Sequence, residues 1–160
     1  MASVKMNKTI PELQLEMTGE KMLKSSDLKG KKIVLYFYPK DNTPGCTTES
    51  IEFQGLKDKF KKLNTKILGI SRDSIKSHEK FKDKYDFSFD LISDESEEIC
   101  KAFDVIKEKN MYGKKYLGIE RSTFFINSNF VLEKSWRGVK AKGHAEQVLQ
   151  YVGSYVKNQL

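Results

Sequence analysis

The sequence predicts an α/β fold, with a mixed sheet that carries helices on both of its faces. Three apolar runs in the first two thirds of the chain are each followed by a helical pattern. Such alternation is typical of a partly parallel sheet with helices on both faces. Two later apolar segments, joined by Asn127-Ser128-Asn129, predict a hairpin that adds antiparallel strands. A chain of 160 residues can bury a core, so we expect one domain, residues 1–160.

The first half of the chain predicts a hairpin, a turn and a strand followed by a long helix. Residues 12–23 alternate around a Thr-Gly-Glu turn, and residues 25–30 predict a single capped turn. The continuous apolar run at 31–38 predicts a strand buried on both faces, and it stops at Pro39. A helix is expected from about Cys46 to Leu63. Its apolar stripe is Phe53, Leu56, Phe60 and Leu63.

The second half repeats the alternation before it closes with the hairpin and a last helix. Short apolar runs predict strands, and apolar residues at helical spacing predict helices. The polar segment KEKNMYGKK, residues 107–115, is expected to be a loop. The expected elements are a strand at 66–71, a helix at 74–85, a strand at 89–93, a helix from 93–96 to about Phe103, strands at 116–127 and 130–139, and a helix from about Gly143 to Asn158.

The charge of the chain indicates a lysine-coated surface. The net charge is +7, and Arg72, Arg121 and Arg137 are the only arginines among 29 basic residues. The lysines are spread along the chain and mixed with acidic residues, and no nucleic-acid-binding motif accompanies them, so no specific nucleic acid is expected as a partner. No apolar run approaches the ~20 residues of a membrane helix, and the start lacks the apolar stretch of a signal peptide. We therefore expect a cytoplasmic protein that does not bind a membrane.

The cysteines and histidines are too few for a structural scaffold. Two cysteines in 160 residues exclude a disulfide framework, so the fold must depend on its core. His78 and His144 lie far from both cysteines in sequence, which argues against a zinc site. We expect no metal, and we expect both histidines to be structural or surface residues.

The loop that ends at Cys46 is the strongest functional signal. A buried strand leads into it and a helix leads out, so Cys46 is expected in the first turn of that helix. Free backbone N–H groups and the helix dipole favour negative charge there, and so favour the nucleophilic thiolate. The Thr43 hydroxyl could point at the same spot, and Pro39 and Pro44 stiffen the loop. These features argue against a purely structural cysteine.

Arg121 is a second candidate site residue. In one strand over 116–127, alternation would place it on an otherwise apolar face. The residues on that face are Leu117, Ile119, Arg121, Thr123 and Phe125. A buried arginine needs an anionic or hydrogen-bonding partner. The candidates are the Cys46 thiolate and Glu49, which lies one helical turn later. A different carboxylate is the third candidate.

These residues resemble a known family. Pro39, Thr43 and Cys46 in PKDNTPGCTTE have the spacing P-x-x-x-T-x-x-C of the peroxiredoxin active-site signature. The longer segment YFYPKDNTPGCTTE is similar to the bacterioferritin-comigratory-protein (PrxQ) branch, and the resemblance continues to the last strand. It implies a thioredoxin-like fold with the peroxiredoxin N-terminal hairpin extension. Arg121 matches the family's catalytic arginine, and Glu49 matches the acidic position that orients it.

The resemblance implies a thiol-dependent peroxidase. The Cys46 thiolate would attack a hydroperoxide and become a sulfenic acid, while Arg121, Thr43 and nearby N–H groups stabilise the charge and Pro39 excludes water. The substrates would be hydrogen peroxide and organic hydroperoxides, with no cofactor. The reductant would be thioredoxin, glutathione or another thiol. This branch is often monomeric, so we expect a monomer.

The sequence departs from the family pattern at the resolving cysteine. Many relatives place it five residues after the first cysteine, where this chain has Ile51, and others place it in the next helix. The only other thiol is Cys100, which either forms a Cys46–Cys100 disulfide or is a core residue. Its position on the apolar stripe of EEICKAF favours the core and a one-cysteine enzyme resolved by an external thiol. A thioredoxin-like redox sensor and a non-catalytic binding module are the two functions that compete with a peroxidase.

Overall fold

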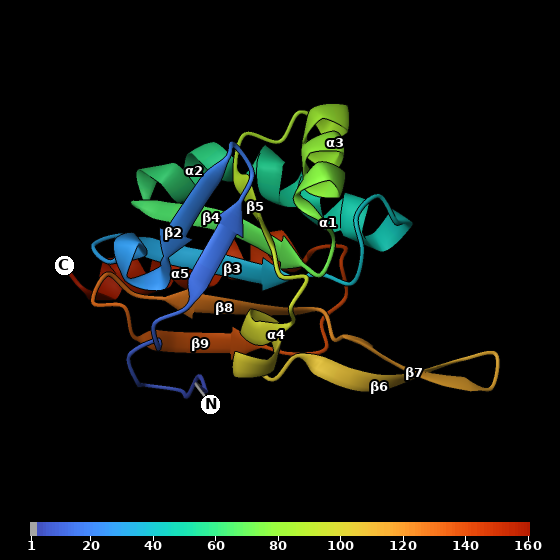
Figure 1. Ribbon diagram of the computed structural model, residues 1–160. Helices are drawn as coiled ribbons and strands as arrows, with labels where there is room; N and C mark the ends of the chain where they lie inside the picture. Colours follow the sequence, from blue (N-terminus) through green and yellow to red (C-terminus); the bar gives the residue numbers. More distant parts are fainter. Residues whose placement is uncertain (1–2) are drawn as a thin grey trace.

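The fold is an α/β sandwich around a mixed sheet (Figure 1). The computed structural model describes residues 3–160. The main sheet has seven strands in the order β2-β1-β5-β4-β3-β8-β9. These strands are β1 (Gln14–Met17), β2 (Lys21–Lys24), β3 (Lys32–Phe37), β4 (Thr65–Ser71), β5 (Asp90–Ser93), β8 (Ser122–Ile126) and β9 (Leu132–Trp136). Strands β3, β4 and β5 run parallel, whereas β1, β2, β8 and β9 join by antiparallel pairing. The predicted mixed sheet is confirmed.

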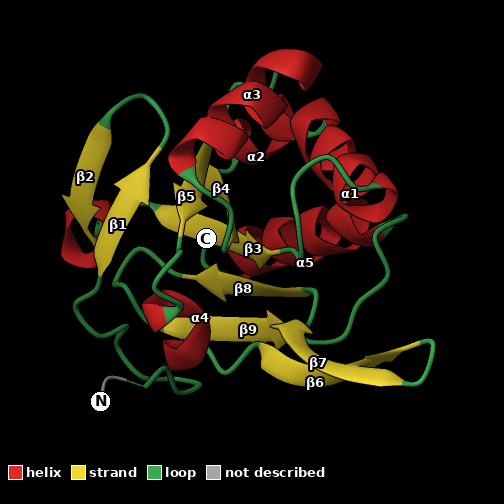
Figure 2. Ribbon diagram, turned by 45° about the vertical axis from the view of Figure 1, so that its right-hand side comes forward, coloured by secondary structure: helices red, strands yellow, loops and turns green. Residues whose placement is uncertain are grey.

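Helices cover both faces of the sheet, but unequally (Figure 2). The helices are a short 3-10 helix η1 (Ser25–Leu28), α1 (Pro44–Gly55), α2 (Lys57–Lys62), α3 (Ile75–Tyr85), α4 (Glu98–Ala102) and α5 (His144–Asn158). One face of β3 presents Val34 and Tyr36 to a cluster that includes residues of α1, α2, α3 and α5. The other face presents Ile33 and Leu35 to α4 and the N-terminal segment. This burial on both sides explains the continuous apolar run of β3.

The predicted helix from Cys46 to Leu63 is wrong in its continuity. Two helices, α1 and α2, occupy this region and are separated at Leu56, which has φ −103° and ψ 4°. Gly55 precedes the break, and glycine is a weak helix former because its backbone is so free when unfolded. The predicted apolar stripe still faces the core, because Phe53 and Phe60 are buried. The prediction for α4 is also too long, because that helix begins only at Glu98.

The segment predicted as a polar loop is instead a β-hairpin. Strands β6 (Ile106–Met111) and β7 (Lys114–Ile119) pair with each other and not with the main sheet. Tyr112 and Gly113 at the turn both have positive φ, as a tight two-residue hairpin turn requires. The hairpin projects from the body of the molecule (Figure 1). Most of its side chains are at least partly exposed, so no apolar periodicity marks its strands.

The predicted single strand over 116–127 is also wrong. It divides into β7 and β8, which belong to different sheets and are separated by Glu120 and Arg121. Alternation therefore does not continue through this segment: the Leu117 side chain is 64% exposed, whereas Phe125 is buried. Arg121 consequently lies in the connection between two sheets rather than on an apolar strand face.

None of the helices in residues 3–160 has the length and apolar character that a membrane span requires.

Candidate active site

Cys46 lies in the first turn of α1, as the sequence predicts. Thr43 is the N-cap, Pro44 occupies the first helical position and Cys46 the third. Proline is suited to that position because its missing N–H would have no partner inside the helix. The N–H groups of a first turn lack intrahelical partners and point out of the helix, where they can meet a negative charge. The Cys46 side chain is 1% exposed and packs in the cluster beneath α1 and α5.

Arg121 reaches both Cys46 and Glu49. Its Nη1 donates to Glu49 Oε1 at 2.7 Å, and its Nη2 donates to Cys46 Sγ at 3.5 Å. Glu49 follows Cys46 by one helical turn, so both groups lie on the same side of α1. One guanidinium therefore connects the carboxylate and the sulfur. The partners predicted from the sequence are the observed ones, although the strand alternation used to predict them is not.

Gly45 leaves room for this arginine. A Cβ atom at position 45 would lie 3.1 Å from Arg121 Nη2, closer than side-chain carbon atoms normally approach a neighbour. The glycine before Cys46 therefore lets the guanidinium lie against the first turn of α1. The sequence alone showed this glycine as a loop feature and gave no sign of its contact with Arg121.

Burial and charge act against each other at the Arg121–Glu49 pair. Burial raises the pKa of Glu49 to about 7, although the positive charge of Arg121 and its hydrogen bond act in the opposite direction. Burial also disfavours the charged form of Arg121, but Glu49 and Cys46 together outweigh this and raise the arginine pKa. The second carboxylate oxygen, Glu49 Oε2, is buried and has no hydrogen-bond partner within the described part of the chain. Glu49 is thus held mainly by one strong contact.

Thr43 and Pro39 belong to the loop before α1, and neither forms a hydrogen bond with the Cys46 sulfur in the described residues. The Thr43 hydroxyl donates to the Lys40 carbonyl at 2.8 Å. The expectation that its O–H group points at Cys46 is therefore wrong. Its oxygen can still accept a hydrogen bond. Pro39 directly follows β3 and is half-buried at the start of the loop.

A buried network anchors the same loop. His78 of α3 is fully buried, and its Nδ1 lies 2.7 Å from Asp41 Oδ2 while its Nε2 lies 2.8 Å from the Ile92 carbonyl. Tyr38 and Ser77 donate their hydroxyls to the same Asp41 carboxylate at 2.6 and 2.8 Å. Both nitrogens of the His78 ring are therefore within hydrogen-bond distance of an oxygen of the protein. The loop before Cys46 is therefore tied to α3 and β5.

Both histidines lie inside the fold, which agrees with the expectation of structural residues and not with that of surface residues. His144 is also buried, with Nε2 2.7 Å from the Thr123 hydroxyl. Asp41, Asp73 and His78 place ligand-type atoms within 4.8 Å of one another. Other protein groups already form hydrogen bonds with atoms of this cluster. The expectation that the protein binds no metal stays a prediction.

Cys100 lies in a different environment from Cys46. It is fully buried in the cluster on the opposite face of the sheet, beneath α4. Its backbone N–H donates to Asp94 Oδ2 at 2.7 Å. Burial, and then the negative charge and hydrogen bond of Asp94, raise the pKa of the Cys100 thiol far above its usual range. The thiolate of Cys100 is therefore strongly disfavoured in this conformation.

Lys109 of β6 is a neighbour of the site that the sequence did not reveal. Burial lowers its pKa, the positive charge of Arg121 lowers it further, and the charge of Cys46 raises it. The base of the hairpin is also tied to the body, since Arg72 donates to the Leu117 carbonyl at 3.4 Å. Because residues 107–115 were predicted to be a loop, no signal indicated that the charges of the site act on one of them.

A thiol in the first turn of a helix beside an arginine, on a thioredoxin-like sheet, defines a class of thiol-dependent oxidoreductases. Comparison with known proteins identifies the family within this class. The model of the AhpC/TSA family matches residues 6–135, and the chain belongs to this family, the peroxiredoxins. The expected thioredoxin-like peroxiredoxin fold is thereby confirmed.

Similar proteins over nearly the whole chain belong to the Bcp/PrxQ branch. Peroxiredoxin Bcp of Xanthomonas campestris is 50% identical over 91% of this chain and 91% of its own length. Peroxiredoxin Bcp of Bacillus subtilis is 46% identical over 92% of this chain and 94% of its own length. A structure of a cysteine-to-serine variant of Xylella fastidiosa PrxQ matches with a TM-score of 0.90 at 44% identity, covering 97% of this chain and 99% of that one.

These relatives define the activity. The protein is an enzyme, a thiol-dependent peroxidase whose substrate is a hydroperoxide and whose reductant is a thiol. The prediction of a thiol-dependent peroxidase and the prediction of its two classes of reactant, a hydroperoxide and a thiol, are confirmed.

Proposed function

We propose that Cys46 is the nucleophile of this peroxidase. The thiolate sulfur bonds to the terminal oxygen of the hydroperoxide while the O–O bond breaks. The departing oxygen takes a proton and leaves as water or an alcohol. Sulfur is oxidised by two electrons to a sulfenic acid, and the peroxide is reduced by two. The observation that carries this proposal is the contact of Arg121 Nη2 with Cys46 Sγ.

Arg121 has two functions in this mechanism. Its Nη2 holds the sulfur in place before the reaction, and its N–H groups stabilise the charge that moves onto the peroxide oxygens. Glu49 is a positioning residue, because it holds Nη1 and leaves Nη2 directed at the sulfur. The oxygen of Thr43 accepts a hydrogen bond from the O–H group of the peroxide, and Pro39 limits the access of water to the thiolate.

Resolution of the sulfenic acid is proposed to need an external thiol. Support comes from the burial of Cys100, its disfavoured thiolate and its place across the sheet from Cys46. One reductant thiol attacks the sulfenic sulfur and releases water, forming a mixed disulfide. A second thiol then frees Cys46 and leaves as the oxidised disulfide. Thioredoxin, glutathione and another small thiol are the candidate reductants.

The substrate range is proposed to include organic hydroperoxides as well as hydrogen peroxide. Support comes from the Xanthomonas campestris bacterioferritin comigratory protein, a neighbour with a TM-score of 0.86 at 49% identity that covers 90% of this chain and 92% of its own. Its structure was solved to examine alkyl peroxide reduction. We further infer a monomeric, cytoplasmic enzyme of one domain that binds no specific nucleic acid.

The test is peroxide consumption with thioredoxin, glutathione and dithiothreitol in parallel. Wild type and Cys100→Ala should turn over with at least one reductant at similar rates. Cys46→Ser should be inactive, and Arg121→Ala should lose about 100- to 1,000-fold in kcat/KM. An active Cys46→Ser variant would refute the nucleophile, and an inactive but folded Cys100→Ala variant would refute the one-cysteine mechanism.

A further inference from the structure

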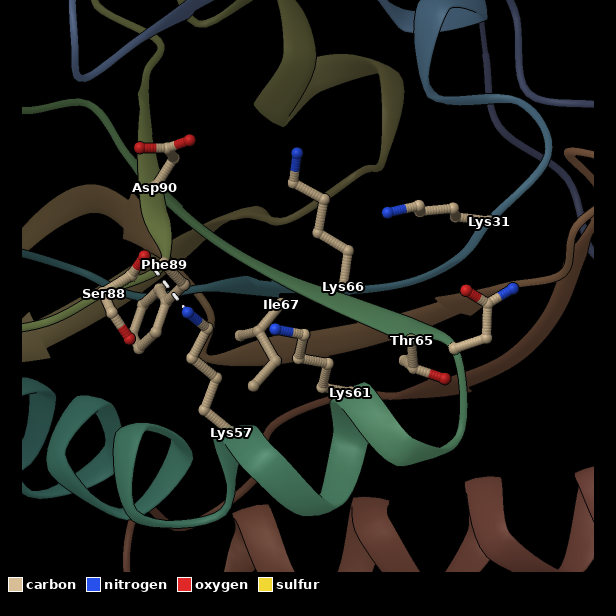
Figure 3. A pocket seen from close by; sticks show the side chains of 10 residues that line it. Lys31, Lys57, Lys61, Thr65, Lys66, Ile67, Ser88, Phe89 and Asp90 are labelled. Carbon is tan, nitrogen blue, oxygen red and sulfur yellow. Dashed lines mark hydrogen bonds between the residues drawn. The ribbon is translucent and has the colours of Figure 1, made fainter.

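A pocket lies at the end of the sheet opposite to Cys46. Cys46 follows the carboxyl end of β3, whereas this pocket lies at the amino ends of β4 and β5 and has a volume of about 300 Å³. Strand β4 begins at Thr65 but pairs with β5 only from Leu68 onward. The first residues of β4 pair with β3 but have no strand partner on the β5 side, and the pocket lies beside this unpaired edge (Figure 3).

Lysines surround this unpaired edge. Lys57 and Lys61 extend from α2, while Lys66 and Lys31 lie on the other side of β4 (Figure 3). Within residues 3–160, none of the four forms an ion pair. Lys57 Nζ instead lies 3.4 Å from the Ser88 carbonyl. The pocket is thus lined by ammonium groups that have no anionic partner.

The single acidic residue in the lining does not neutralise them. Asp90 is already bound by Lys21 and by Lys82, the latter at 2.9 Å, and it accepts a hydrogen bond from Thr18 at 3.0 Å. Burial lowers the pKa of Lys66, and although Asp90 opposes this, the positive charges of Lys21 and Lys31 lower it further. An anion in the pocket would relieve this repulsion among like charges.

The chemistry of the lining indicates the class of ligand. Lysine ammonium groups are compact point charges that bind phosphate oxygens without a fixed planar geometry. Four of them on two sides of one strand edge suit an anion with several charges spread over several oxygens. A single carboxylate would leave most of them unpaired.

We propose that the pocket formed by Lys31, Lys57, Lys61, Lys66 and the free edge of β4 binds a small phosphate anion of the pyrophosphate type. The site is separate from the thiol site and does not depend on the assignment of Cys46. Free pyrophosphate, the phosphate chain of a nucleotide and a nucleic-acid backbone share this chemistry. The proposal is for the small free anion.

Helix α2 offers a matched pair of variants for the test. Lys57→Gln/Lys61→Gln removes two charges that line the pocket, and Lys59→Gln/Lys62→Gln removes two from the same helix outside the pocket. Titration calorimetry at constant ionic strength should show saturable binding of pyrophosphate to wild type. The first variant should lose at least tenfold in affinity, whereas the second should stay within twofold of wild type. Peroxidase activity should be unchanged in both and reports that each is folded.

Two results would overturn the proposal. Equal losses in the two variants, or no saturable binding to wild type, would show a diffuse basic surface instead of a site. Tighter binding of a short single-stranded oligonucleotide than of pyrophosphate or ATP would overturn the assignment to a small free anion.

Discussion

At the scale of single residues, Glu49 combines two opposing demands. Its carboxylate must be charged to hold Arg121 strongly, yet it is fully buried and one of its oxygens has no partner in the described residues. Burial of a charge is costly unless the charge is paired and hydrogen-bonded. The charge and hydrogen bond of Arg121 offset part of the free-energy cost of burying the carboxylate. The part that is not offset raises the pKa of Glu49 to about 7.

This raised pKa makes stability depend on pH in a defined window. The pKa of Glu49 rises from 4.5 to about 7 on folding, so its contribution to stability is complete below about pH 4.5 and is lost as the pH rises to 7. Glu49→Gln removes the titration. The difference in the free energy of unfolding between wild type and this variant should shift against wild type by roughly 2 kcal/mol between pH 5 and pH 8. Urea unfolding at the two pH values measures it, and a constant difference would contradict the prediction.

His78 is a second residue whose substitution should have a large effect, because it is fully buried and both of its ring nitrogens have partners inside the fold. His78→Gln removes the ring that bonds to the buried Asp41 carboxylate and to the Ile92 carbonyl, so stability should fall by about 1–3 kcal/mol. Peroxidase kcat/KM should fall as well, because the loop before Cys46 loses its anchor. The double variant Asp41→Asn/His78→Gln also replaces the buried carboxylate that has lost a partner, and should regain part of the stability. Urea unfolding compares the three proteins, and a double variant no more stable than His78→Gln would show that Asp41 and His78 do not stabilise the fold through their contact.

At the scale of elements, α1 contains two glycines with different surroundings. Gly45 lies against Arg121, whereas a Cβ at Gly55 would meet no atom within 4 Å. Gly45→Ala should displace the guanidinium and lower kcat/KM about tenfold with little change in stability. Gly55→Ala should instead stabilise the protein by about 0.5–1 kcal/mol through helix propensity and leave activity unchanged. Peroxide kinetics and thermal unfolding of both variants test this, and equal activity in the two would show that the Gly45 contact has no effect on Arg121.

The elements also show what local sequence patterns can predict. The strands β3, β4 and β5 and the helix that begins at Cys46 were predictable because burial imposes apolar runs and helical periodicity. The β6–β7 hairpin was not, because it projects into solvent and its strands need no apolar face. This error explains why the contact of Arg121 was predicted correctly for the wrong reason.

Contacts between distant residues leave no such pattern. Asp41 and His78 are 37 positions apart, and each looks like an ordinary polar residue in its own segment. The charges of Arg121 and Cys46 act on Lys109, a residue far from both in sequence. The family signature pointed to Pro39, Thr43 and Cys46, and the resemblance further along the chain pointed to Arg121. The network that holds them follows from the fold.

At the scale of the whole molecule, the sheet separates the two thiols. Cys46 packs with α1 and α5 on one face, and Cys100 packs with α4 and β1 on the other. A Cys46–Cys100 disulfide would therefore require one cysteine to leave its cluster and pass around the sheet. The cost of exposing the buried Cys100 environment adds to that of forming its thiolate.

Peroxide treatment without reductant should therefore oxidise Cys46 alone. One equivalent of hydrogen peroxide should yield protein heavier by one oxygen, or its product after trapping of the sulfenic acid, with Cys100 still alkylated by iodoacetamide after denaturation. Cys100→Ala should give the same product at the same rate. Intact-mass and peptide analysis of both proteins provides the measurement. An intramolecular disulfide in wild type, seen as the loss of two hydrogens and absent from Cys100→Ala, would mean that the sheet does not keep the thiols apart and that Cys100 is the resolving cysteine.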